Sequence, residues 1–205
     1  MTNCFLIADE AAREAVLIDA PDHTTGLLLD EASRRGWDVT GLWLTHGHFD
    51  HFADHGVVRQ RFPGAKILIH ALDEPKARQP DMQTRLFGLP LVIPPLEADG
   101  HITDKQKLRI GALEVVVLHT PGHSPGHVAF HFPQERILVG GDLIIGGSIG
   151  RTDLPDSDPS RMESSIRRVM ELPAETRLLG GHGSETTLGQ ERQENPFVRA
   201  VLEKS

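Results

Sequence analysis

The sequence predicts an α/β domain, and three observations support this prediction. Short apolar runs rich in Val, Ile and Leu alternate with segments of helical periodicity, and strand–helix alternation is typical of α/β proteins. The 205 residues suit one domain with a sizeable core. We find no internal repeat or low-complexity tract. We therefore expect a single domain over residues 1–205.

Seven apolar runs have the length and the β-branched content of buried strands. They are residues 15–20, 41–46, 66–71, 113–120, 127–132, 136–142 and 176–182.

Helices are predicted between these strands, at about residues 24–35, 50–61 and 159–171, with a further candidate at the C-terminus. The third helix has a clear start signal, because Asp158 can cap its N-terminus and Pro159 suits the first helical position. Its apolar face is formed by Met162, Ile166, Val169 and Met170. The glycine- and proline-rich stretches 88–100 and 146–159 are expected to be loops.

Charge and composition exclude several function classes. The formal net charge is −8, with no Lys/Arg cluster longer than a pair, so nucleic acid is not an expected partner. No apolar run approaches the ~20 residues that span a bilayer, and the start of the chain has no secretory signal pattern. The only cysteine, Cys4, fits a reducing compartment, so we expect a cytoplasmic protein. We expect Cys4 to be a small core or strand residue and not a reactive thiol.

Histidine is the unusual feature of the composition. The stretch "THGHFDHFADH" (45–55) holds four histidines and two aspartates. Four expected strands end in polar, glycine-flanked groups, "LTHGH", "HTPGH", "VGGD" and "LGGH", and these ends would converge if they shared one sheet edge. Nitrogen and oxygen ligands of this kind suit zinc, iron or manganese.

Two metal ions would give such a cluster a definite chemistry. A metal-bound water has its pKa lowered to ~7, which supplies hydroxide at neutral pH. Two ions ~3.5–4 Å apart can hold that hydroxide while polarising the bond to be broken. A carboxylate bridging the ions would fix their spacing.

The motifs "THGHFDH", "PGHSPGH", "GGD" and "GGHG", in this order, resemble the metallo-β-lactamase superfamily. "GRTDLP" (150–155) and "TLGQERQENPF" (187–197) narrow the resemblance to its glyoxalase II-like (hydroxyacylglutathione hydrolase) branch, in particular the short single-domain bacterial enzymes. The resemblance implies a four-layer αββα sandwich with the site at one edge of the paired sheets. It also implies that the C-terminal helical domain of classical glyoxalase II is missing here.

The family pattern implies a ligand set for two divalent ions, expected to be zinc, with iron or manganese as alternatives. Metal site one would be His46, His48 and His123. Metal site two would be Asp50, His51 and His182, and Asp142 would bridge both ions. The nucleophile would be the bridging hydroxide, and Asp50 would also be the partner for the proton of the attacking water.

The sequence also indicates roles for Thr45 and for the histidines outside the implied ligand set. Thr45 can orient a neighbouring ligand through its hydroxyl or can simply be a β-branched strand residue. His127 is expected to support the "PGHSPGH" loop through a hydrogen bond. His119 is ambiguous between such a role and the core. His55 is expected on a solvent-facing helix surface outside the site. The remaining histidines are expected to be structural or surface residues: His23, His70, His101 and His131.

Arg151 is the candidate substrate-binding residue. The resemblance places it near a position that helps to hold a carboxylate of glutathione in larger glyoxalase II enzymes, and a guanidinium can bind a carboxylate through two hydrogen bonds. A structural ion pair with Asp153 or Asp156 is the alternative, and the sequence leaves both open.

The function implied by the resemblance is hydrolysis of a hydroxyacyl-glutathione-type thioester, in methylglyoxal detoxification. A broader thioesterase is also consistent, because the chain contains no tyrosine for a glutathione pocket. The rival function is a mononuclear iron persulfide dioxygenase that uses His46, His123 and Asp142. "GGHG" keeps His182 available for a second ion, which favours hydrolysis. Lactonase or β-lactamase activity of the same superfamily ranks third, and the oligomeric state is open.

Overall fold

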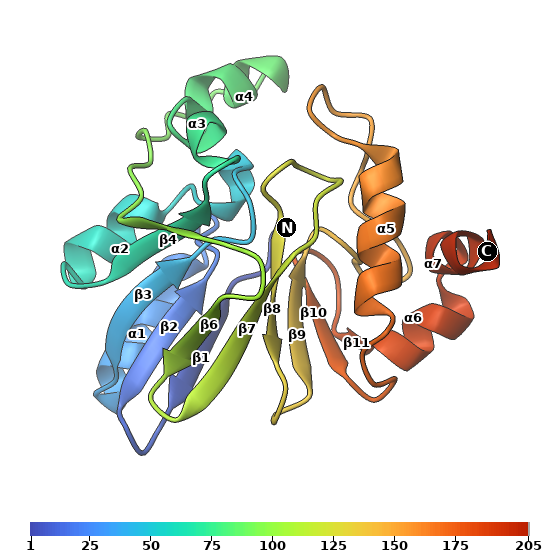
Figure 1. Ribbon diagram of the computed structural model, residues 1–205. Coiled ribbons are helices and arrows are strands. Elements are labelled where there is room, and N and C mark those ends of the chain that lie inside the picture. Colours follow the sequence, from blue (N-terminus) through green and yellow to red (C-terminus); the bar gives the residue numbers. More distant parts are fainter. Residues whose placement is uncertain (205) are drawn as a thin grey trace. The chain divides into compact units, whose positions relative to one another are not determined.

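The computed structural model describes residues 1–204, which form two compact units. The N-terminal unit comprises residues 2–102 and 109–113. The C-terminal unit comprises residue 1, residues 103–108 and the chain from Glu114 onward. Each unit contains its own hydrophobic core, and Figure 1 shows the helices and strands of both.

The sheet of the N-terminal unit has five strands in the order β1-β2-β3-β4-β5. They are β1 (Phe5–Asp9), β2 (Glu14–Ile18), β3 (Asp38–Trp43), β4 (Lys66–His70) and β5 (Gly100–Ile102). β1 is antiparallel to β2, whereas β2, β3, β4 and β5 are parallel to one another. The carboxyl ends of β2, β3 and β4 therefore meet at one edge, the usual place for a site in an α/β sheet.

The helices of the N-terminal unit are α1 (Thr25–Arg35), the 3₁₀ turn η1 (Phe49–His51), α2 (His55–Arg61), α3 (Glu74–Ala77) and α4 (Pro80–Leu86). Leu29 of α1 and Val58 of α2 are fully buried in the same core as Leu42 and Ile67 of the sheet. Burial of a side chain of this size contributes roughly 1.5–3 kcal/mol. This core supports the loops that follow the strands.

The sheet of the C-terminal unit has six strands in the order β11-β10-β9-β8-β7-β6. They are β6 (Lys107–Ile110), β7 (Leu113–His119), β8 (Val128–Phe132), β9 (Ile137–Gly141), β10 (Arg177–Gly180) and β11 (Thr186–Thr187). β8 is antiparallel to β7 and β9, and β10 is parallel to β9. β7, β9 and β10 thus run in one direction, and their carboxyl ends share an edge.

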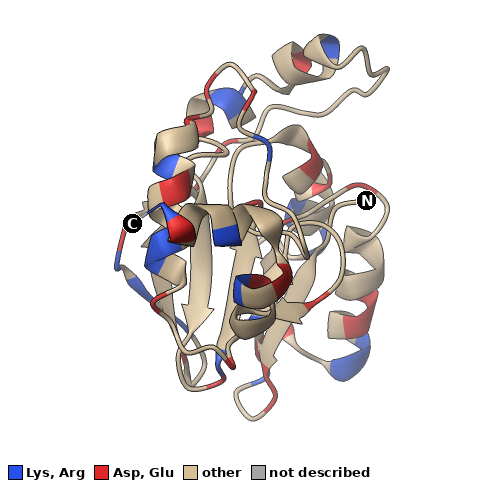
Figure 2. Cartoon of the chain, turned by 90° about the vertical axis from the view of Figure 1, so that its right-hand side faces the viewer, with Lys and Arg blue, Asp and Glu red and all other residues tan. Residues whose placement is uncertain are grey.

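The described part of the C-terminal unit contains the helices α5 (Pro159–Val169), α6 (Leu188–Glu194) and α7 (Pro196–Glu203). Asp158 caps α5, because its side chain accepts hydrogen bonds from the amides of Ser160 and Arg161. The predicted apolar face of α5 is buried in the core, and the charged residues of these helices are visible in Figure 2. The start of α5 and its buried face are confirmed.

The predicted strands all occur, with ends that differ by up to three residues. β1, β5, β6, β11, α3 and α4 were not predicted. The helix predicted over 50–61 is wrong in its first turn, because the chain forms η1 and then a turn before α2 begins. The carbonyl of His51 accepts a hydrogen bond from the Ala20 amide at 2.7 Å, and the Asp54 amide donates to the Ala20 carbonyl at 2.9 Å. These bonds to the end of β2 replace the helical ones.

Within residues 1–204, no helix combines the length and the apolar character that a membrane crossing requires.

Asn195 links α6, α7 and the loop after β9, and its loss should be costly. This fully buried side chain accepts from the Phe197 and Val198 amides and donates to the Ser148 carbonyl and to Glu191 Oε2. We expect Asn195→Ala to lower the free energy of unfolding by about 2–3 kcal/mol, measured by urea denaturation.

The comparison variant is Asp158→Ala. It removes the exposed cap of α5 and leaves no buried polar group without a hydrogen-bond partner. We expect its effect to be smaller than that of Asn195→Ala. Equal effects would show that the buried hydrogen bonds of Asn195 add nothing to its capping role.

Candidate metal centre

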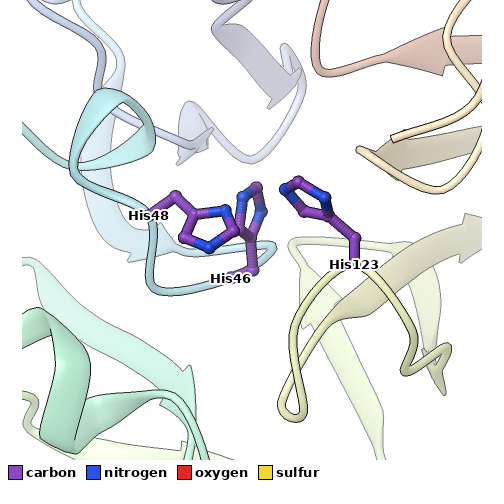
Figure 3. Close-up of side chains that lie close together, drawn as sticks. All are labelled: His46, His48 and His123. Carbon is purple, nitrogen blue, oxygen red and sulfur yellow. The ribbon is translucent and has the colours of Figure 1, made fainter. Parts of the chain in front are cut away.

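The N-terminal unit collects four of the expected ligands on the loop after β3. His46 and His48 leave this loop as shown in Figure 3, and Asp50 and His51 lie in η1. A ring nitrogen of His46 lies within 4.8 Å of one of His48 and of one of His51, and a carboxylate oxygen of Asp50 is equally close to His51. His46 and His51 are fully buried. These four side chains form the N-terminal half-site.

Asp19, which directly follows β2, holds the N-terminal half-site together. Its carboxylate is 2 % exposed and accepts hydrogen bonds from the Thr45 amide (2.8 Å), the Thr45 hydroxyl (2.8 Å) and His51 Nδ1 (2.8 Å). Asp19 has a φ of +60°, a backbone conformation uncommon outside glycine. Strain of this kind persists only where surrounding bonds fix it, and here three of them do.

Lys76 of α3 gives the N-terminal half-site a cation. Its Nζ lies 3.1 Å from His48 Nε2. An ammonium group only donates hydrogen bonds, so His48 Nε2 is the acceptor. A positive charge therefore already lies beside the lone pair of this imidazole.

The C-terminal unit collects the other three expected ligands at the shared edge of β7, β9 and β10. His123 lies on the loop between β7 and β8 (Figure 3). Asp142 follows β9, and His182 follows β10. Asp142 Oδ2 is 3.4 Å from His123 Nε2 and 3.3 Å from His182 Nε2. One carboxylate oxygen thus contacts two imidazoles, and these three side chains form the C-terminal half-site.

The surroundings of the C-terminal half-site fix its orientation. His127 is fully buried; its Nε2 accepts from the Asp142 amide at 2.9 Å, and its Nδ1 lies 2.9 Å from the Thr120 hydroxyl. A Cβ added at Gly150 would collide with the Asp142 carbonyl and would lie 3.0 Å from His123 Nδ1. Only glycine lets the chain pass this close to Asp142 and His123.

The hydrogen bonds determine the tautomer of every candidate ligand histidine. Nδ1 of His51, His123 and His182 faces Asp19, the Arg151 carbonyl (2.9 Å) and the Met1 carbonyl (3.1 Å), all of which only accept. These imidazoles therefore carry their proton on Nδ1.

His46 follows the same rule through Thr45. Because the Thr45 hydroxyl donates to Asp19, its oxygen accepts from His46 Nδ1 at 3.0 Å. In all five histidines, counting His48, Nε2 carries the lone pair. Five basic Nε2 atoms and two carboxylates are a donor set that fits divalent zinc, iron or manganese.

The Arg151 side chain makes the ion pair that the sequence offered as its alternative role. Its Nε and Nη2 donate to the two carboxylate oxygens of Asp153, at 2.7 and 2.9 Å, and its side chain is 56 % exposed. Its guanidinium thus faces Asp153, while its backbone carbonyl holds His123.

Sequence reasoning was wrong about His55 and missed Asp19. His55 is only 5 % exposed, because it packs against Phe52 and its Nδ1 lies 2.9 Å from the Phe52 carbonyl. Asp19 ends the run "AVLIDA" and thus follows a strand, as Asp142 does in "VGGD". The sequence therefore contained a signal for Asp19, but a single acidic residue after a strand is not part of a recognisable motif.

Of the four strand ends expected to share an edge, three do, and β3 belongs to the other sheet.

Comparison with known proteins identifies relatives over nearly the whole chain. Residues 1–182 match the family described as the metallo-beta-lactamase superfamily. A hydroxyacylglutathione hydrolase, GloC of Haemophilus influenzae, is 32 % identical over 97 % of this chain and 93 % of its own.

Solved structures agree with this assignment. TTHA1623 in a di-iron-bound form is 38 % identical, with a TM-score of 0.84 over 96 % of this chain and 95 % of that one. The BLEG-1 B3 metallo-beta-lactamase is 34 % identical, with a TM-score of 0.87 over 96 % and 94 %. ETHE1 from Myxococcus xanthus is 26 % identical, with a TM-score of 0.79 over 97 % and 80 %. The expected metallo-β-lactamase fold is confirmed.

Asp19→Asn should weaken metal binding while leaving the fold intact. Asparagine has the same size but only one acceptor oxygen. It cannot accept from the Thr45 amide, as Oδ1 does, and also from the Thr45 hydroxyl and His51, as Oδ2 does. Partners of metal ligands typically contribute 10–100-fold to metal affinity, and we expect a loss of about that size in competition with a chromophoric chelator. Asp22→Asn, three residues away and exposed, is the control. Wild-type affinity in Asp19→Asn would remove Asp19 from the metal centre.

His55 should make the stability of the protein depend on pH. Burial is the main reason why its pKa is lowered in the folded protein, whereas in the unfolded chain it is about 6.5. The unfolded state therefore takes up the proton first, and the fold loses stability as the pH falls below about 6.5.

Urea denaturation between pH 5 and 7 measures this effect. We expect His55→Gln to show a smaller rise of unfolding free energy with pH than the wild type. His23→Asn, at an exposed histidine, should keep the wild-type slope. The same slope in all three proteins would contradict the assignment.

Proposed function

Because the chain belongs to the metallo-β-lactamase superfamily of metal-dependent hydrolases, we propose that it hydrolyses a hydroxyacyl-glutathione-type thioester with two divalent ions. The observation that carries this proposal is the complete donor set of the two half-sites, with Nε2 as the basic nitrogen of every candidate ligand histidine. The physiological role would be methylglyoxal detoxification, in the reducing cytoplasm that a single cysteine suits.

We propose that the two half-sites act as one dinuclear centre and the two units as one functional domain over residues 1–205. His46, His48 and His123 would hold the first ion. Asp50, His51 and His182 would hold the second, and Asp142 would be shared by both. Support for the bridging role comes from Asp142 Oδ2, which lies within 3.4 Å of His123 and 3.3 Å of His182. Zinc is the proposed metal, and iron is the leading alternative because TTHA1623 binds two irons.

When bound, two such ions supply a water of lowered pKa and an electrophile for the thioester carbonyl. The protein's own contribution is to hold the ligands and to manage the proton. The Asp50 carboxylate is suited to accept the proton of the attacking water, because its side chain is 34 % exposed and lies beside His51. The Thr2 hydroxyl donates to Asp50 Oδ2 at 2.7 Å and orients it. Thr45, Asp19 and His127 keep the ligands in place.

The thioester substrate is supported by the relative of Haemophilus influenzae, which is named a hydroxyacylglutathione hydrolase and matches along nearly its whole length. The alternative is a mononuclear iron persulfide dioxygenase, which the likeness to ETHE1 at 26 % identity keeps open. That enzyme would use His46, His123 and Asp142 and would leave Asp50, His51 and His182 without a metal. The presence of all three in ligand-bearing positions favours hydrolysis.

The test combines metal analysis with two activity assays on protein purified without added metal. We expect two metal ions per chain and hydrolysis of lactoylglutathione. Asp142→Asn should lose most of this activity and bind metal more weakly, whereas His23→Asn should not. One iron per chain with oxygen uptake on a glutathione persulfide would overturn the proposal in favour of the dioxygenase.

Arg151 is proposed to bind a carboxylate of the thiol carrier, which would replace Asp153 as the partner of its guanidinium. Both partners are exposed, and an exposed ion pair costs little to break. We expect Arg151→Ala to raise KM for lactoylglutathione much more than it lowers kcat. Asp153→Ala, which frees the guanidinium, should leave KM unchanged or lower it. An unchanged KM in Arg151→Ala would assign Arg151 a purely structural role.

A further inference from the structure

The loop that carries His48 is held from outside by the segment from Asp73 to Gln83. Gln83 of α4 is 8 % exposed, and its carboxamide reaches the two peptide groups that flank His48. Oε1 accepts from the Phe49 amide at 3.0 Å, and Nε2 donates to the Gly47 carbonyl at 3.0 Å. One side chain thus fixes the backbone on both sides of a candidate metal ligand.

Asp73 adds a third bond to the same loop. Its fully buried carboxylate accepts from the Gly47 amide at 2.8 Å. A Cβ at Gly47 would lie 2.6 Å from the Asp73 carbonyl, so the loop and this segment are in direct contact. Both peptide polar groups of Gly47 and the amide of Phe49 are therefore bound to Asp73 and Gln83.

The position of Gln83 is itself well defined. Its Nε2 also lies 3.3 Å from the Lys76 carbonyl, which ties α4 to α3. The rings of Phe87, which follows α4, and Phe49 contact each other with centroids 6.0 Å apart. The Gln83 carboxamide is consequently held by α3, by α4 and by the loop it supports.

A histidine on an irregular loop has no helix or sheet to fix its Cα–Cβ direction. His48 has an extended backbone (φ −80°, ψ 139°) and precedes η1. If its neighbours were free to move, metal binding would have to order them, and this cost would reduce the affinity. Hydrogen bonds to both flanking peptides remove that cost in advance.

We propose that Gln83 is a positioning residue that sets the affinity of the ion held by His48, with Asp73 as its partner. The inference rests on the proposed function only in taking His48 as a ligand. It requires an unequal effect on the two ions, because Thr2 orients Asp50 and Asp19 orients His51, and Gln83 takes part in neither of these hydrogen bonds. Loss of Gln83 weakens one ion and spares the other.

Three variants separate the hydrogen bonds from the bulk of the side chain. Gln83→Leu keeps the size but removes both bonds. Gln83→Glu keeps an acceptor for the Phe49 amide and places a carboxylate against the Gly47 carbonyl. Gln79→Leu, at an exposed glutamine at the start of α4, is the matched control.

The measurement is stepwise zinc binding in competition with a chromophoric chelator, together with the visible spectrum of the cobalt-substituted protein. We expect one of the two ions to bind about 10–100-fold more weakly in Gln83→Leu and Gln83→Glu, with a changed cobalt spectrum. The other ion should bind as in the wild type, and Gln79→Leu should match the wild type throughout. Excess metal should restore kcat in the Gln83 variants.

Equal weakening of both ions, or none, would overturn the inference. A Gln83 variant that unfolds at a lower temperature but keeps both affinities would also overturn it, because it would show a structural role alone. The two proposals fail separately. If the wild type binds two ions but does not hydrolyse lactoylglutathione, the substrate proposal falls, while a selective loss in Gln83→Leu still supports the positioning role. If the wild type binds one ion and Gln83→Leu leaves its affinity unchanged, both proposals fall.

Discussion

The hydrogen bond at Nδ1 of the candidate ligand histidines is the interaction on which the site depends. A neutral imidazole has one basic nitrogen, and the acceptor opposite Nδ1 decides that this nitrogen is Nε2. Asp19 serves His51 directly and His46 through Thr45, and the Arg151 carbonyl serves His123. If these acceptors were replaced, the rings would be free to turn or to change tautomer, and the ligand set would lose its common orientation.

Both units bring their candidate ligands together at the carboxyl ends of parallel strands. In the N-terminal unit, the parallel strands β2, β3 and β4 deliver Asp19, the loop 45–51 and Asp73 to one sheet edge. In the C-terminal unit, β7, β9 and β10 deliver His123, Asp142 and His182 to another. Parallel strands place consecutive carboxyl ends side by side, so ligands that are far apart in the sequence become neighbours. The buried carboxylate of Asp19 is stabilised by the donors that surround it.

The sequence predicted the parts of the fold whose signal is local. Apolar runs marked β2, β3, β4 and β7 to β10, and Asp158 with Pro159 marked the start of α5. The short strands β5 and β6 and the helices α3 and α4 were missed because their form depends on long-range partners. Gln83, for example, lies in the seven-residue helix α4, which has no strong sequence pattern. Its role exists only because the loop 47–49 lies against it. The prediction for His55 was wrong because helical spacing shows only which residues share a helix face. Whether that face is buried depends on how the helix packs against the core.

The sequence by itself determined the metallo-β-lactamase fold and the residue types of the candidate site, because the order of the motifs and the chemistry of their side chains can be identified from short sequence segments. Only the tertiary structure decided the tautomers, the partners Asp19, Asp73 and Gln83, and the ion pair of Arg151. Most of these features are hydrogen bonds between residues far apart in the sequence, up to the 181 positions that separate Met1 from His182. Their geometry follows from how strands and loops pack, and no local pattern records it.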